Sequence, residues 1–112
     1  MPVKDKAALR DILKAASMVL KFARNESLEE LAANQMRLSA VLYQIVIMGE
    51  AARRLSPELR QQHPEVPWAD IIGMRSHLVH GYDGVIISEV WQVIQRDLNE
   101  LVPKMESILA SL

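Results

Sequence analysis

The sequence predicts an all-α protein, an up-and-down bundle of four main helices plus a short helix. Apolar residues recur at steps of three and four along most of the chain, which is the spacing of one face of an α-helix. Capping residues and prolines stand where this pattern is interrupted. The 112 residues suit a single domain, 1–112, and the 50% hydrophobic content is enough to build one core.

The first two helices are predicted over residues 5 to 24 and about 28 to 55. The run from Val41 to Met48 in the second helix offers few polar atoms. We therefore expect more than one side of that helix to be covered, part of it by a second copy of the chain. The first helix has its apolar residues at Leu9, Ile12, Leu13, Ala16, Val19, Leu20 and Ala23.

A short helix and a third long helix are expected next. Ser56 is a capping residue and Pro57 suits the first helical position, so a short helix should run to Gln62. Pro67 then opens a helix over residues 68 to 80.

The last helix is predicted to start near Ser88 and to be kinked. Pro103 should cause the kink, because proline has no N–H to donate to the carbonyl of Asn99. The apolar positions alternate steps of three and four, as in a bundle seam, at Trp91, Ile94, Leu98, Leu101, Met105, Ile108 and Leu112.

Composition and charge narrow the functional classes. The absence of cysteine excludes disulfides, thiol nucleophiles and the usual Cys-based zinc sites. No signal peptide and no apolar run of about 20 residues is present, so we expect a cytoplasmic protein with no membrane role. A net charge of −1 argues against indiscriminate nucleic-acid binding. Any RNA contact should be local, through Arg53, Arg54, Arg60 and Arg75.

The most informative motif for function is an arginine, four residues, a histidine, one residue and a tyrosine. Arg75 is a permanent cation suited to phosphate, and His80 can accept or donate a proton near neutral pH. Five helical steps leave the two about 140° apart, so they do not share one face of a regular helix. Gly81 can end the helix there, and a two-fold dimer would supply each residue twice in one cleft.

The motif belongs to a longer framework in a fixed order. Its parts are GEAARRL at 49–55, HPEVPW at 63–68, IIGMR at 71–75, RSHLVHGY at 75–82 and VW at 90–91. This pattern resembles the HEPN superfamily of small helical ribonucleases and RNA-binding domains, most closely its HepT-like toxin subgroup. The resemblance covers residues 41 to 102.

The resemblance implies a metal-independent endoribonuclease toxin that works as a homodimer on tRNA or mRNA and needs no cofactor. His80 would act as general base on a ribose 2′-hydroxyl, and Arg75 would stabilise the charge of the transition state. In HepT-like toxins the tyrosine of the motif accepts AMP from an MNT-type nucleotidyltransferase antitoxin. Tyr82 is the matching position, and AMP there would compete with RNA by bulk and charge.

Two further residues are expected to support the site. Ser76 stands where HEPN nucleases often have asparagine or another polar residue. Glu50 could orient Arg75 from the second helix, or it could be an exposed charge paired with an arginine one turn away. We assign no metal: His77 and His80 lie three residues apart, but no third ligand stands at suitable spacing.

Structural roles are the alternative for each of these residues. Arg75 could form an ion pair with Glu50 or Asp70, His80 could cap a helix, and Tyr82 could simply pack its ring. The corresponding alternatives for the whole chain are a non-catalytic helical partner that helps a minimal nucleotidyltransferase bind nucleotide or RNA, and a purely structural dimerisation subunit. The arginine–histidine pair favours the nuclease over both.

Overall fold

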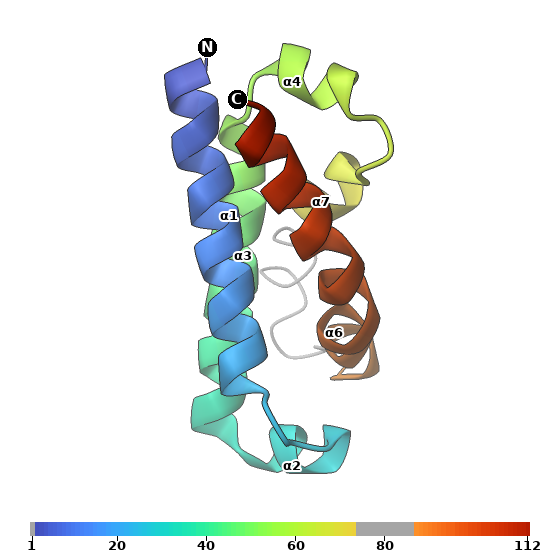
Figure 1. The fold of residues 1–112 in the computed structure, drawn as a ribbon. Coiled ribbons are helices and arrows are strands. Elements are labelled where there is room, and N and C mark those ends of the chain that lie inside the picture. The colour runs from blue at the N-terminus through green and yellow to red at the C-terminus, as the bar shows by residue number, and fades with distance from the viewer. Residues whose placement is uncertain (1, 74–86) are drawn as a thin grey trace.

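The computed structural model describes residues 2–73 and 87–112, with side chains over 4–73 and 89–112 (Figure 1). This part of the chain is almost entirely helical and contains no β-strand, which confirms the all-α prediction. No helix in it is long and apolar enough to cross a bilayer. The helices are α1 (Pro2–Phe22), α2 (Leu28–Ala33), α3 (Gln35–Arg54), α4 (Pro57–Gln62), α6 (Ile87–Gln92), the π-helical turn η2 (Val93–Asp97) and α7 (Leu98–Ser111); residues 68–73 are also helical.

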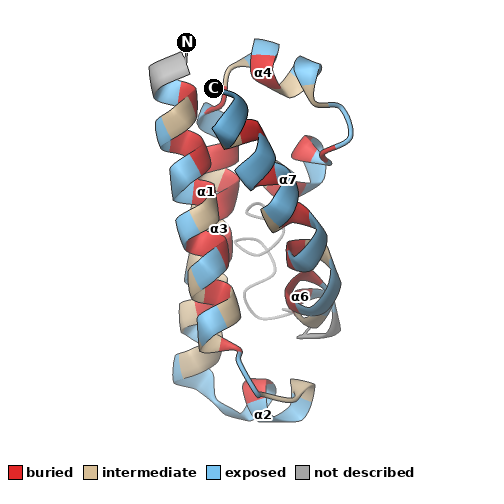
Figure 2. Ribbon diagram, viewed as in Figure 1, coloured by how far each residue is buried: buried red, intermediate tan, exposed pale blue. Residues whose placement is uncertain are grey.

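The helices are arranged up and down around one core. Figure 1 shows α1 and α3 running antiparallel side by side, with α7 packed against α1 and α2 closing the far end. Buried residues of each helix face this interior, as the red segments of Figure 2 show. The largest fully buried side chains are Leu9, Ile12, Leu31, Ile45, Met48, Leu55, Leu98, Met105, Val19 and Val41.

The first helix agrees with the prediction, with small shifts at its ends. It begins at Pro2 and ends at Phe22, after which the N–H of Ala23 donates to the carbonyl of Val19 at 3.0 Å. Asn25 has a φ of 61°, in the left-handed region, where asparagine is better tolerated than most residues. This residue turns the chain towards α2.

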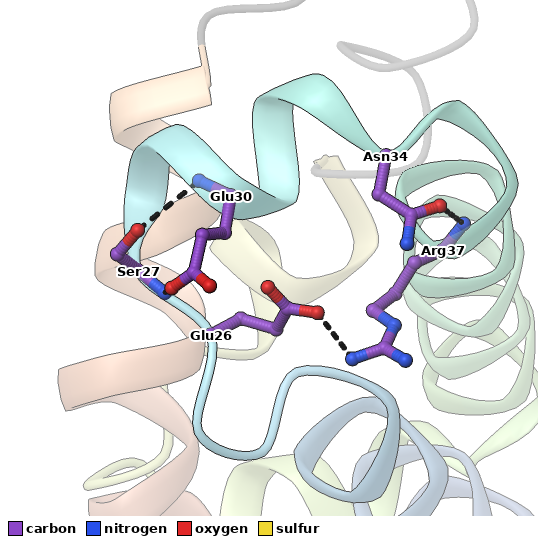
Figure 3. Close-up of polar contacts among 5 residues, drawn as sticks. All are labelled: Glu26, Ser27, Glu30, Asn34 and Arg37. Carbon is purple, nitrogen blue, oxygen red and sulfur yellow. Dashed lines mark hydrogen bonds and ion pairs between the residues drawn. The ribbon is translucent and has the colours of Figure 1, made fainter.

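The prediction of a single helix over about 28 to 55 is wrong, because the helix is interrupted at Asn34. Asn34 has φ −105° and ψ 89°, and it ends α2 while it caps α3. Its side-chain Oδ1 accepts a hydrogen bond of 3.0 Å from the N–H of Arg37, and Arg37 also forms an ion pair with Glu26 (Figure 3). An asparagine side chain offers the backbone this local alternative to a continuous helix.

The start of α2 has a capping box, visible in Figure 3. The N–H of Ser27 donates to Glu30 Oε1 at 2.9 Å, and the N–H of Glu30 donates to Ser27 Oγ at 3.1 Å. The hydrogen bond from the Ser27 backbone favours the ionised carboxylate and lowers the pKa of Glu30.

The short helix α4 confirms its prediction and is tied to α1. Ser56 Oγ accepts from the N–H of Leu59 at 3.2 Å, which is the expected cap. Ser56 also donates to the buried carboxylate of Asp5, from its N–H at 2.9 Å and from its hydroxyl at 2.7 Å. The first turn of α1 is therefore fixed to the corner between α3 and α4.

The C-terminal helix starts at Ile87, one residue before the predicted position, but it contains a π-helical turn that the sequence did not reveal. In η2 the N–H of Leu98 donates to the carbonyl of Val93. Asn99 Nδ2 donates to the carbonyl of Gln95 at 2.7 Å. Pro103 lies inside α7 on its exposed side, where it donates no bond to the preceding turn.

Candidate functional site

The central residues of the predicted site lie outside the described residues. Arg75, Ser76, His80 and Tyr82 all belong to the segment 74–86, as does His77. Of the predicted site residues, only Glu50 is described. The structure therefore informs the site through the elements that precede and follow this segment.

The helical turn that leads into the segment is firmly anchored. Trp68 is buried, and its indole Nε1 donates to the carbonyl of His63 at 2.9 Å. The N–H of Ile71 donates to the carbonyl of Pro67 at 3.1 Å, so the first helical bond starts at the proline, as predicted. Val66 and Ile71 are buried beside Trp68 in the same core. The described chain is thus anchored in the core shortly before residue 74.

The element that follows the segment is anchored as well. Val90, Val93 and Ile94 are 3%, 8% and 3% exposed, and they place α6 and η2 in the common core. The described residues on both sides of positions 74–86 are therefore held in the core by apolar packing.

Glu50 lies one turn before the C-terminal end of α3 and is half-buried. It is 7 residues after Tyr43 and 14 after Met36. Because seven residues make about two turns of an α-helix, all three lie on one face. Met36 is 85% exposed and Tyr43 is 64% exposed, so this face points away from the core. Both proposed partners of Glu50, Arg75 and a neighbouring arginine, stay open.

A pocket of about 220 Å³ lies between the 67–71 turn and the C-terminal helix. Five of its lining residues belong to the buried core: Met48, Ile71, Val93, Leu98 and Leu101. Its rim carries charges of both signs, and Arg96 Nε lies 3.4 Å from Asp97 Oδ1. The lining residues are Met48, Pro67, Asp70, Ile71, Val93, Arg96, Asp97, Leu98, Glu100, Leu101 and Lys104. With three acids and two cations, this rim is not a site specific for anions.

The arginines expected to contact RNA differ in their surroundings. Arg53 is exposed. Arg54 Nη2 lies 2.5 Å from Asp11 Oδ2, so an acid of α1 partly neutralises it. Arg60 is half-buried, and its Nε is buried with no hydrogen-bond partner among the described residues. Among these three, Arg53 is the one placed most openly for a phosphate.

Within 2–73 and 87–112, no three side chains of His, Cys, Asp or Glu come together in a metal-binding group. His63 Nδ1 lies 3.4 Å from Glu65 Oε1, which is a local contact in the loop before Pro67. No residue of α1 was among the predicted functional residues, although lysine and arginine are concentrated near the N-terminus of the sequence.

Comparisons with known proteins agree with the sequence pattern. A family model described as ribonuclease HepT-like matches residues 12–108. A protein of Methanocaldococcus jannaschii named as a "putative RNase" is 32% identical over 92% of this chain and 94% of its own length. A protein of Thermococcus cleftensis named "probable ribonuclease HepT" is 30% identical over 89% of this chain and 91% of its own length. No solved structure gives a significant match.

Proposed function

The chain belongs to the HepT-like family of ribonucleases, and we propose that it is the toxin of a toxin–antitoxin pair that cleaves RNA without a metal ion. The observation that supports this most is the order of Arg75, His80 and Tyr82 within the residues that the family model matches. The proposed substrate is cellular tRNA or mRNA, which places the activity in the cytoplasm.

The proposed reaction is an internal transesterification. His80 takes the proton from a ribose 2′-hydroxyl, and the resulting oxyanion attacks the adjoining phosphorus. Arg75 stabilises the additional negative charge of the pentacovalent transition state. The bond to the 5′-oxygen of the next nucleotide breaks, and that oxygen takes up a proton. The product carries a 2′,3′-cyclic phosphate, and DNA resists because it lacks the attacking hydroxyl.

We place the active site at a two-fold homodimer interface, formed in part by the outward face of α3. Met36 and Tyr43 are large hydrophobic residues left exposed on that face, and Glu50 lies on the same face. A dimer across it would bring two copies of Glu50 together, and we propose that the motif of each copy lies beside them in one cleft. Each Arg75 and His80 would then contribute to a composite site.

Regulation is proposed to act at Tyr82. A cognate MNT-type nucleotidyltransferase antitoxin would transfer AMP to the tyrosine hydroxyl, two residues from His80. The added phosphate is an anion and would occupy the guanidinium of Arg75 that otherwise meets the RNA phosphate. Removal of the nucleotide would restore cleavage.

The nuclease is tested with protein whose mass shows no modification at Tyr82, incubated with total RNA and tRNA in EDTA. Wild type should cut and leave cyclic phosphate ends, whereas His80→Ala and Arg75→Ala should lose at least about 100-fold in rate. His63→Ala and Arg96→Ala are matched controls and should cut as wild type does. Intact RNA with wild type, or equal cutting by His80→Ala, would replace the nuclease by the non-catalytic partner of a nucleotidyltransferase.

The dimer is tested by Tyr43→Asp, with Gln61→Asp on α4 as a control of equal charge and exposure class. Light scattering should show a dimer for wild type and the control, and a monomer for Tyr43→Asp with an unchanged circular dichroism spectrum. Cleavage should fall with the dimer. A monomeric wild type, or a monomeric variant that still cuts fully, would contradict the composite site.

A further inference from the structure

The cations of the chain are concentrated in its first helix. Residues 1–25 contain six of the 13 lysine and arginine residues but only two of the 14 aspartate and glutamate residues. The chain as a whole has a net charge of −1, so the remainder is acidic. A near-neutral protein thus presents one strongly basic element.

Both acids of α1 are turned towards the corner between α3 and α4. Asp5 is 5% exposed and accepts hydrogen bonds from the backbone and hydroxyl of Ser56. Asp11 pairs with Arg54. Asp5 therefore lies opposite the solvent-facing side of α1. Asp11 lies about 60° around the helix from Lys14, at the edge of that side, and its charge is matched by Arg54.

That side carries a cationic stripe, defined here as Arg10, Lys14, Lys21 and Arg24. All four are exposed. At about 100° per residue, Arg10 and Lys21 lie within about 40° of Lys14, so these three share one face of the helix. With a rise of about 1.5 Å per residue, Lys14 and Lys21 are about 10 Å apart along the axis. Arg24 follows in the turn after the helix.

An open groove of about 610 Å³ lies beside the stripe, between α1 and α7, which Figure 1 shows next to each other. Three cations and one carboxylate, Glu106, line it, together with a serine and three apolar residues. The complete lining is Leu13, Lys14, Ser17, Leu20, Lys21, Arg24, Val102 and Glu106. Three cations beside aliphatic side chains suit a ligand that combines repeated phosphates with less polar groups.

We propose that the cationic stripe and this groove bind the phosphate backbone of a single-stranded segment of the RNA substrate, apart from the cleavage motif. This inference rests on the proposed function for the identity of the ligand. Charge complementarity selects RNA, since a row of like charges along one helix matches a strand of phosphates without sequence readout. The surface would hold the substrate and leave the bond-breaking step to Arg75 and His80.

The test is binding of a labelled single-stranded RNA, measured by fluorescence anisotropy in a His80→Ala background so that the RNA stays intact. At about 0.1 M salt, Lys14→Gln/Lys21→Gln should bind about tenfold more weakly, and its slope of log affinity against log salt should fall by about 1.4, because each single-strand phosphate contact contributes about 0.7. A single-stranded DNA of the same sequence should show the same loss, since phosphates are what the stripe contacts.

Two controls make the result specific. Lys4→Gln/Lys6→Gln removes the same charge from the same helix at positions about 80° to either side of Lys14, and it should bind as the parent does. Lys14→Arg/Lys21→Arg keeps the charge and should also retain binding. An equal loss of RNA affinity in the Lys4→Gln/Lys6→Gln variant would show that overall charge, and not the stripe, causes the effect, and it would overturn the proposal.

The two proposals fail separately. Unchanged RNA binding in Lys14→Gln/Lys21→Gln would overturn the stripe even if wild type cleaves RNA. If RNA binding depends on the stripe but wild type does not cleave RNA, the nuclease proposal is contradicted and the stripe proposal is supported. Unchanged RNA binding together with lost binding of the nucleotidyltransferase would assign the stripe to an acidic protein surface and overturn the proposal.

Discussion

The two long helices α1 and α3 have similar lengths and pack against each other, yet their outward faces differ. Their inward faces are alike, with fully buried aliphatic residues such as Leu9 and Ile45. Outward, α1 presents a row of cations, whereas α3 presents Met36 and Tyr43. Inward faces must satisfy the same core, while outward faces are free to differ. The difference suggests separate partners: RNA for α1 and a second copy of the chain for α3.

The largest expected effect in this comparison contrasts a fully buried position of α3 with its half-buried neighbour. Ile45 is 1% exposed, so Ile45→Ala should lower the free energy of unfolding by about 2–5 kcal/mol through lost burial and a cavity. Val46→Ala, at the half-buried neighbouring position, should lower the free energy of unfolding by about 1 kcal/mol or less. Urea denaturation at one fixed protein concentration measures both. Similar losses would mean that α3 is covered equally on both sides.

The two acids of α1 should differ in a similar way. Asp5→Ala leaves the Ser56 N–H and hydroxyl without their acceptor at a part-buried site, which should cost about 1–3 kcal/mol. Asp11→Ala breaks a pair whose side chains are 51% and 56% exposed, and it should cost about 1 kcal/mol or less. Thermal unfolding of the two variants compares them. A larger loss for Asp11 would contradict the picture of Asp5 as the main tie between α1 and α4.

The connection between α1 and α3 gives a smaller effect. Ser27→Ala removes the side-chain acceptor for the N–H of Glu30 and should cost about 1 kcal/mol. Ser39, exposed on α3, is the matched control, and Ser39→Ala should change stability little. Chemical denaturation measures both; no difference between them would show that α2 depends on packing alone.

The smallest effect concerns the charge of Glu30. Its pKa is lowered by the Ser27 hydrogen bonds, so the stabilisation by its carboxylate is present above the ordinary value and is lost as the pH falls through the lowered one. Glu30→Gln keeps the shape of the capping box. The stability difference between wild type and Glu30→Gln should therefore be seen at neutral pH and vanish in acid. A difference that persists at low pH would assign it to something other than the charge.

The sequence predicted most helices but missed two irregularities. The sequence pattern did not predict the helix break at Asn34, because apolar residues continue in helical register on both sides of it, at Leu31 and Leu38. Its local signal, an asparagine able to cap the next helix, was present. The π-turn η2 gave no such signal in the pattern of apolar residues. Packing of Val93 and Ile94 in the core accompanies it, and Asn99 bonds one of its carbonyls.

Some candidate functional residues could be found from the sequence and others could not. The motif of Arg75, His80 and Tyr82 could be recognised because its chemistry requires particular residue types at short spacing, and the family match over residues 12–108 agrees with it. Their catalytic roles stay a prediction. The cationic stripe on α1 could not be recognised from the sequence, because the extent to which its charges are neutralised depends on where the side chains of Asp5 and Asp11 point.

The sequence by itself determined the helical class, the family and the inward face of each long helix, since these follow from local spacing and residue type. Only the tertiary structure decided what the outward faces present. Ser56 and Arg54 are distant in sequence from α1, yet Ser56 binds the buried Asp5 and Arg54 pairs with Asp11, so that both carboxylates of the helix are engaged beside its exposed cations. Such an arrangement depends on contacts across more than 40 residues, which no local pattern encodes.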